Sequence, residues 1–279
     1  FGSNTHGQLG AGDTIDRVAS TAVAVGFAIG VVHVAVGSLH SCAVLADASA
    51  RCWGFNGNGE HGQEHRVGTS GQAGDVDGLP AVNFGESVTV SQIAAGNCHT
   101  CAIVSSVGGG SGVVKCWGCG AQGQLGVGIV DSVGGEVGDM GASLTAANSG
   151  MSEAASILAV GDYSCFLGVG GDLYCWGAAS WFGGEVVVAP QRVPLSFPIA
   201  RVSCGLNHCC ALDTTGVVWC WGDGSKGQLG PQSQSTSPEA AVQVPGTATL
   251  PVQKVVVGDC FSCASGGFGV NCWGCSVRR

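Results

Sequence analysis

The chain returns every 45 to 64 residues to one short phrase, a cysteine followed by Trp-Gly. The copies stand at Cys52-Trp53-Gly54, Cys116-Trp117-Gly118, Cys175-Trp176-Gly177, Cys220-Trp221-Gly222 and Cys272-Trp273-Gly274, and Phe1-Gly2 opens the chain in the same phase. Repeats at this spacing are typical of propellers and solenoids, whose units bury their apolar faces only against neighbouring units. Function is therefore expected on a surface rather than in one pocket.

Each unit shows the same order of features around this phrase. A polar glycine loop follows Trp-Gly at residues 3–10, 55–62, 119–126 and 223–230, and the copy at 178–184 is degenerate. A Val/Ala-rich run then leads to a glycine and a second cysteine, as in residues 34–43 and 93–102. A short hairpin returns the chain to Cys-Trp-Gly.

The pattern Gly-x-x-His-Ser-x-Ala, followed by Trp-Gly-x-Asn-x-x-Gly-Gln-Leu-Gly, resembles the repeat of the regulator of chromosome condensation family. The resemblance covers nearly the whole chain and implies an all-β fold, a β-propeller in which each repeat supplies about one four-stranded antiparallel blade. We expect a single disulfide-stapled domain over residues 1–279. Its five repeats have the phases 1–52, 53–116, 117–175, 176–220 and 221–272. That family usually has seven blades, and its intracellular members are not rich in cysteine.

The ends of the chain lie at equivalent points of the repeat, because Phe1-Gly2 has the phase of Trp273-Gly274. This phase predicts five blades closed into a ring, and a segment cut from a longer array would show the same phase. The terminal repeats have no polar capping sequence, which favours closure, because an open stack exposes apolar faces at both ends.

Composition agrees with short strands joined by tight turns. Glycine makes up 50 of 279 residues and only 10% of residues are charged, and glycine supplies the positive φ that such turns need. One short helix is expected within the stretch Gly134 to Ile157, which includes residues 151–156. The nearly uncharged run Val18 to Val36 is long enough for a membrane span, but it occupies a strand slot of the repeat, so we expect two buried strands and no span.

The sixteen cysteines pair off in the repeat alignment. One pair flanks the hairpin of each repeat, two repeats add a pair three residues outside it, and the last two cysteines pair by elimination. The pairs are Cys42 with Cys52, Cys101 with Cys116, Cys165 with Cys175, Cys210 with Cys220, Cys263 with Cys272, Cys98 with Cys119, Cys260 with Cys275, and Cys204 with Cys209. Pairing of every cysteine indicates an oxidising compartment.

Zinc is the rival interpretation of the cysteines. Cys98 and Cys101 with Cys116 and Cys119 copy the paired CxxC of a zinc ribbon, and Cys260, Cys263, Cys272 and Cys275 do so again. Three other repeats keep only the inner pair, so disulfides explain all five repeats with one rule. Redox catalysis is the weakest alternative, because no thioredoxin-like βαβ pattern surrounds the cysteines.

No motif indicates catalysis. Gly-x-Gly-x-x-Gly at residues 118–123 and 222–227 matches a dinucleotide fingerprint in letters, but both copies are repeat turns with no following helix. His40, His99 and His208 recur at one repeat position, which favours a structural role over metal binding. An acidic set in the long inserts leaves calcium open, although solvated loops explain it better and the spacing matches no EF-hand loop. The set is Asp75, Asp77, Asp131, Glu136 and Asp139.

Surface features indicate protein partners. Trp181 and Phe182, in the degenerate turn, form a candidate contact patch, and the rival interpretation is simple packing. A net charge of -9 argues against nucleic acid binding, which draws on basic patches. The Ser/Thr-rich loop Ser233 to Ser237 leaves O-linked sugar open. The chain begins inside a repeat without Met, so any secretory signal is expected upstream.

We therefore expect a non-catalytic extracellular or cell-surface module, a structural or adhesive unit of an appendage, filament or coat, with no cofactor. Its partners are expected to be copies of itself or other subunits. The alternative is a secreted binding or inhibitor module that grips a partner with loops of one face. Guanine nucleotide exchange, which only fold analogy supports, is a remote third.

Overall fold

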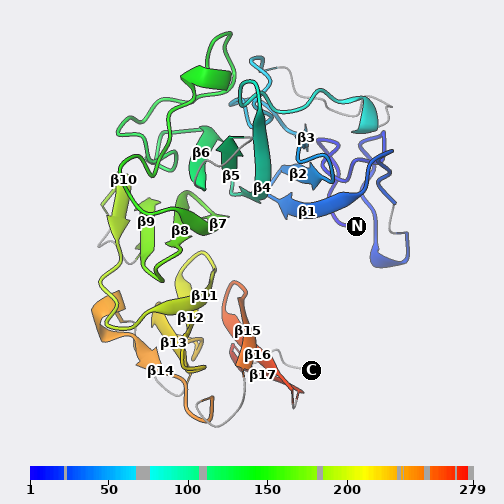
Figure 1. The fold of residues 1–279 in the computed structure, drawn as a ribbon. Helices are drawn as coiled ribbons and strands as arrows, with labels where there is room; N and C mark the ends of the chain where they lie inside the picture. Colours follow the sequence, from blue (N-terminus) through cyan, green and yellow to red (C-terminus); the bar gives the residue numbers. More distant parts are fainter. Residues whose placement is uncertain are drawn as a thin grey trace.

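The computed structural model describes residues 1–21, 24–66, 76–106, 112–180, 185–230, 234, 236–247, 252–267 and 269–275. Its strands form five antiparallel sheets, one for each repeat, which we call blades 1 to 5. Figure 1 shows the blades side by side in an arc, with the first strand of each blade nearest the common centre. The prediction of an all-β propeller built from five repeats is confirmed.

The strands of each blade follow one another in the sequence. Blade 1 contains β1 (Val31–Val36), β2 (His40–Leu45) and β3 (Ala50–Gly54). Blade 2 contains β4 (Val88–Ala95), β5 (His99–Ser106) and β6 (Val113–Gly118). Blade 3 contains β7 (Ala154–Val160), β8 (Tyr163–Gly168), β9 (Leu173–Gly177) and β10 (Val187–Arg192). Blade 4 contains β11 (Ile199–Cys204), β12 (His208–Asp213), β13 (Val218–Gly222) and β14 (Val242–Gln243). Blade 5 contains β15 (Val252–Val257), β16 (Phe261–Gly266) and β17 (Gly269–Gly274).

The fourth strand of the blade is the least regular part. Only blades 3 and 4 have four strands among the described residues. In blades 1 to 4, however, an outer segment donates one backbone hydrogen bond of 2.8–2.9 Å to the same position of the third strand. The donor and acceptor residues are Val82 and Ala50, Ala147 and Val114, Val193 and Leu173, and Val244 and Val218. Outside the strands the chain forms short 3₁₀ turns, namely η1 (Ala19–Thr21), η2 (Val76–Gly78), η3 (Gly141–Ser143) and η5 (Pro238–Ala240).

The glycine of Cys-Trp-Gly explains why the phrase recurs. It ends the third strand with φ between +96° and +117° in all five blades, a region that L side chains rarely adopt. A Cβ atom there would lie 2.4–2.6 Å from a backbone carbonyl oxygen. Glycine is therefore the residue that lets the chain leave the blade and enter the next loop.

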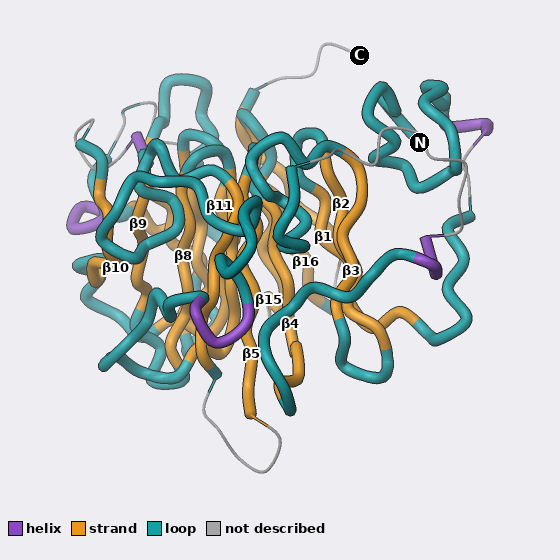
Figure 2. The backbone as a smooth tube through the Cα atoms, turned by 90° about the horizontal axis from the view of Figure 1, so that it is seen from above, coloured by secondary structure: helices purple, strands orange, loops and turns teal. Residues whose placement is uncertain are grey.

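Each blade has two faces, one toward the preceding blade (its leading face) and one toward the following blade (its trailing face). At the first junction, Cys42 and Val44 on the trailing face of blade 1 join Ile93 and Ala95 on the leading face of blade 2 in one buried cluster. Equivalent clusters fill the other three junctions. Figure 2 shows the strands running side by side between two rims of loops. The core thus lies between blades, as expected of repeat units.

The arc is open, so the expected closure of five blades into a ring is wrong. Each inner strand contacts the next, β1 with β4, β4 with β7, β7 with β11 and β11 with β15. Among the described residues no contact of that extent joins blade 5 to blade 1, and Figure 1 shows the opening between β1 and β15–β17.

Two local expectations need correction. The described residues of the run Val18 to Val36 contain one strand, β1, rather than two, and most of them are not buried, since Val18 is 69% and Val36 is 74% exposed. The physical reason is the open arc, because no blade covers the leading face of blade 1. In the stretch 134–157, where one short helix is expected, the only helical turn is the 3₁₀ turn η3 at Gly141–Ser143. Residues 151–156 are not helical, and β7 begins at Ala154. Within the described residues, no helix is long and apolar enough to cross a membrane.

Candidate functional site

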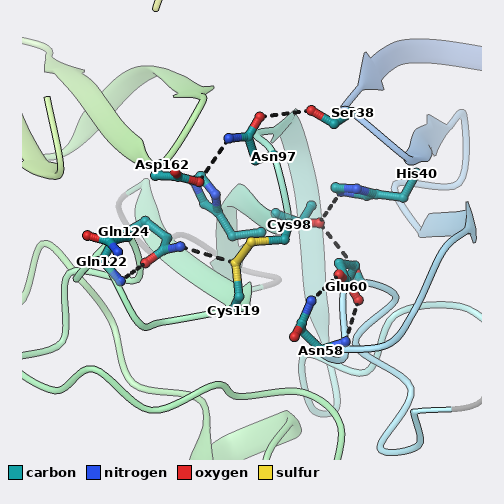
Figure 3. The surroundings of a disulfide bond; sticks show 12 residues. Ser38, His40, Asn58, Glu60, Asn97, Cys98, Cys119, Gln122, Gln124 and Asp162 are labelled. Atoms are coloured by element: carbon teal, nitrogen blue, oxygen red, sulfur yellow. Dashed lines mark hydrogen bonds between the residues drawn. A yellow bond between two sulfur atoms is a disulfide. The ribbon is translucent and has the colours of Figure 1, made fainter.

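The cysteines form eight disulfides with the expected partners. The five inner bonds, which include Cys42–Cys52 and Cys263–Cys272, join directly opposite residues of the second and third strands, with Cα atoms 4.0–4.1 Å apart. Figure 3 shows the outer bond Cys98–Cys119, whose Cα atoms are 5.5 Å apart. In each blade, one or two disulfides thus join neighbouring antiparallel strands.

The acidic inserts have structural roles where they are described. One carboxylate oxygen of Asp139 accepts hydrogen bonds from the backbone N–H groups of Gly134, Gly135 and Glu136. Glu136 itself pairs with Arg66 at 3.0 Å. Asp75 and the side chain of Asp77 lie outside the described residues. No group of three or more His, Cys, Asp or Glu side chains in the described part of the chain could hold a metal ion.

The recurring histidines join one blade to the next. Nε2 of His40, His99 and His208 lies 2.8–3.0 Å from a hydroxyl of the following blade, on Thr100, Ser164 and Ser262 respectively. Each hydroxyl donates in turn to a backbone carbonyl of the glycine loop, at Glu60, Gln124 and Gln228. The same carbonyls accept the indole N–H of Trp117, Trp176 and Trp273. We call this arrangement the interblade latch, and Figure 3 shows His40 and Glu60 of its first copy.

The latch fixes the protonation of its histidines. Because the hydroxyl donates its proton to the loop carbonyl, its oxygen is left to accept, and the histidine donates from Nε2. Burial lowers the pKa of His40 to about 4 and that of His99 to about 3. Burial also lowers the pKa of His208, to about 4. A polar contact of this kind aligns neighbouring blades but provides no group poised for proton transfer near neutral pH.

Blades 3 and 4 use a variant of the latch. Tyr163 stands at the histidine position, and its hydroxyl donates to the carbonyl of Gly205 at 2.6 Å. The larger donor is needed because the hydroxyl position of blade 4 is Cys209, which is bonded to Cys204. The loop that would accept the Trp221 indole is the degenerate one, and that buried N–H has no partner among the described residues.

Hydrogen bonds within each glycine loop explain its recurring sequence. The side-chain carbonyl oxygen of Gln8, Gln124 and Gln228 accepts the backbone N–H two residues earlier, and Oε2 of Glu60 does the same. Desolvation raises the pKa of Glu60. His61 follows it in place of the leucine of the other loops. It is fully buried, and although the Gly54 backbone lies near, neither ring nitrogen reaches hydrogen-bonding geometry.

The trailing face of blade 5 is exposed. The inner disulfide cysteines on the trailing faces of blades 1 to 4 are at most 1% exposed, whereas Cys272 is exposed and Cys263 is half-buried. Phe261 and Val270 on the same face are 42% and 67% exposed. Val256, the cross-strand neighbour of Cys263, is 42% exposed. This face keeps the apolar character of a blade junction without a blade to cover it.

The leading face of blade 1 is exposed at its inner strand. Val34 and Val36 are 63% and 74% exposed, while Ile93 and Ala95, at the same positions of blade 2, are 1% and 8% exposed. The outer half of the face is covered by the chain itself, where Trp53 packs with Val25 and Phe27. Together with the trailing face of blade 5, this surface forms what we call the end faces.

Sequence reasoning missed the end faces, although one signal was available. Phe261 stands where other repeats have histidine or tyrosine, so blade 5 has no donor for a latch to a following blade. The expected contact patch, Trp181 and Phe182, lies outside the described residues, as do Ser233 and Ser235 of the possible glycan loop. Trp219, the other non-repeat tryptophan, stacks on Phe197 with ring centroids 4.7 Å apart.

Comparison with known proteins agrees with this geometry. Two models of the regulator of chromosome condensation (RCC1) repeat match the chain, one at residues 31–60 and 199–228 and the other at residues 1–44 and 215–265. The ultraviolet-B receptor UVR8 of Arabidopsis thaliana is 30% identical over 243 residues, which are 82% of this chain and 50% of the receptor. The mitochondrial RCC1 domain-containing protein RUG3 of the same plant is 29% identical, over 72% of this chain and 44% of RUG3. The chain thus spans about half the length of these relatives.

Solved structures show the same fold. Human WBSCR16 superposes with a TM-score of 0.71 and 16% identity, over 90% of this chain and 64% of that protein. Prp20p of Saccharomyces cerevisiae, described with its binding to Gsp1p and histones, superposes with a TM-score of 0.64 and 19% identity, over 88% of this chain and 58% of Prp20p. The five blades therefore correspond to about three fifths of these larger proteins.

Proposed function

Because the chain is a β-propeller of the regulator of chromosome condensation type, we propose that it is a non-catalytic protein-binding module that joins an extracellular assembly through its end faces. The observation that carries this proposal is the exposure of two surfaces that are buried at every other junction. Val34 and Val36 form one, and Phe261, Val270 and Cys272 belong to the other. Exposed apolar surface of this kind marks protein contact sites.

The partner that fits the end faces is a blade of the same repeat type. A trailing face offers a disulfide flanked by apolar side chains, and the leading face of such a blade supplies the alanine, valine and isoleucine side chains that cover it at the other junctions. The chain covers only 64% of WBSCR16 and 58% of Prp20p, both of which are larger. The opening of the arc therefore has room for further blades.

An extracellular setting is supported by the cysteines, since eight disulfides with no free cysteine suit an oxidising compartment. A non-catalytic role is supported by the buried, neutral state of the latch histidines, which leaves them without access to a substrate. Binding to Gsp1p and histones, the property given for Prp20p, is less well supported, because eight disulfides suit an oxidising compartment. The net charge of -9 argues separately against direct contact with nucleic acid, which draws on basic patches.

Photocrosslinking in the native assembly tests this proposal. A photoreactive residue is placed at Val36 or at Val270, one on each end face, and the matched control carries it at Val137, a loop residue that is 91% exposed. We expect the end-face probes to crosslink to a peptide that contains the Cys-Trp-Gly repeat, and the control probe to give no such product.

Two results would contradict the proposal. If both end-face probes stay uncrosslinked in the native assembly, the end faces are not its contacts. If the Val137 probe captures a partner while the end-face probes are silent, the loops of one rim bind the partner, as the inhibitor-type alternative predicts.

A further inference from the structure

The five inner strands carry an irregularity at one common position. In each of them the register to the second strand shifts by one residue, as in a β-bulge. The residue that follows the shift is polar in every blade, although the strands are otherwise rich in Val, Ile and Ala. These residues are His33, Gln92, Ser156, Arg201 and Lys254.

Four of these five residues line one cavity. It has a volume of about 610 Å³ and lies between the inner strands β1, β4, β7 and β11, with His33, Gln92, Ser156 and Arg201 in its wall. Its other walls are mainly small and apolar, with alanine from all four strands. The size falls in the range of about 300–1,000 Å³ that is usual for ligand pockets. Figure 1 places these strands around the centre of the arc.

The charge of the inner strands is opposite to that of the molecule. The chain as a whole carries -9 with only 10 Lys and Arg residues, yet the five inner strands contain no Asp or Glu and hold two of these cations, Arg201 and Lys254. Both side chains are exposed. Within the described residues neither forms an ion pair. Arg201 lies in the cavity wall, and Lys254, which does not line the cavity, holds the same register position on the adjacent inner strand. The two residues place unpaired positive charge on this side of the arc, which favours an anionic ligand.

The remaining polar groups suit a ligand that accepts hydrogen bonds. Oε1 of Gln92 accepts the backbone N–H of Ile157 at 2.7 Å, which orients the amide so that its NH₂ is the group left to donate. Nδ1 of His33 is buried and has no hydrogen-bond partner among the described residues. A guanidinium, an amide NH₂ and an imidazole on apolar walls match a carboxylate attached to an apolar chain.

We propose that the centre of the arc binds an extended acidic peptide segment, whose carboxylate pairs with Arg201 and Lys254 while its small apolar residues contact the alanine walls. Val34 and Val36 belong both to the wall of this cavity and to the leading end face, whereas Arg201 belongs to the cavity alone. Loss of peptide binding in R201Q therefore tests this proposal, and crosslinking from Val270 tests the proposed function independently.

Fluorescence anisotropy with labelled peptides tests this site. The probe is Val-Glu-Ala-Glu-Val, and the matched peptide is Val-Gln-Ala-Gln-Val. We expect the acidic peptide to bind at least about tenfold more tightly than its neutral match, since a charge-assisted hydrogen bond contributes about 1.5–3 kcal/mol. The difference should shrink as salt is raised.

The variants R201Q and K254Q locate the site. Each should weaken binding of the acidic peptide about tenfold or more, while K226Q, which removes the same charge from an exposed loop residue, should leave the affinity unchanged. Thermal unfolding of each variant checks that the arc is intact. Unchanged affinity in R201Q, equal binding of the two peptides, or equally tight binding of free glutarate would overturn the proposal.

Discussion

At the residue scale, the chain aligns its blades with a small set of buried polar side chains that must stay neutral. Burial lowers the pKa values of His40 and His99 to about 4 and about 3. Unfolded histidine titrates near 6.5, so between about pH 6.5 and pH 4 the unfolded chain binds protons that the folded chain does not. The free energy of unfolding must therefore fall as the pH falls through this window.

Urea unfolding at pH 7.5, 5.5 and 4.5 checks this prediction. The midpoint should drop stepwise with pH, and the drop should occur above the range in which ordinary carboxyl groups titrate. Glu60 works in the opposite direction, because its raised pKa makes its protonation favour the folded state. A midpoint that is constant from pH 7.5 to 4.5 would show that the histidines are not buried and neutral.

His61 is a residue-scale exception with a clear consequence. The other glycine loops have leucine here, at Leu9, Leu125 and Leu229, and the ring of His61 is buried without a well-formed hydrogen bond. The variant H61L should raise the free energy of unfolding by about 1–3 kcal/mol, the usual cost of an unsatisfied buried polar group. The converse variant L125H should lower it by a similar amount, as measured by urea unfolding at pH 7.5. A loss of stability in H61L would mean that the histidine is satisfied.

At the element scale, each blade is a short hairpin closed by a covalent rung. The loops closed by the inner disulfides span 9 to 15 residues, for which the chain-entropy model gives about 3 kcal/mol per bond. Several such bonds together are comparable to the whole stability of a typical domain. Blades this rich in glycine therefore depend on their disulfides.

Non-reducing peptide mapping tests the pairing. We predict links between Cys42 and Cys52 and between Cys165 and Cys175, with no free thiol in the native protein. Full reduction should lower the melting temperature sharply. Free thiols together with stoichiometric zinc would contradict this pairing and support the paired CxxC interpretation.

The sequence predicted these elements well because a local requirement fixes each of them. The positive φ at Gly54 and its counterparts needs glycine, and directly opposite cysteines need fixed spacing, so both leave a visible pattern. The Tyr163 and Cys209 variant of the latch was not predicted. This variant depends on two residues in different blades that compensate for each other. An alignment of the repeats shows them only as two separate departures from the repeat sequence.

At the scale of the whole molecule, the sequence could not predict whether the arc closes. Closure depends on whether the trailing face of blade 5 meets the leading face of blade 1, which lies far away in the sequence. The sequence does not show whether Val34 or Val270, on these faces, is covered or exposed. The exception is Phe261, which cannot donate to Ser41, the hydroxyl that a closing blade 1 would offer. In the structure that hydroxyl donates to the carbonyl of Gln8.

The central claim is that the arc is open and that its end face at blade 5 is accessible, and selective reduction tests it most directly. The protein is treated briefly with a water-soluble phosphine, exposed thiols are alkylated, and the sites are mapped by mass spectrometry. We predict that Cys263–Cys272 opens first, because Cys272 is exposed. The equivalent bonds of blades 1 to 4, whose cysteines are at most 1% exposed, should stay intact as internal controls. Equal protection of all five inner bonds would show that another blade covers this face, and would contradict the open arc.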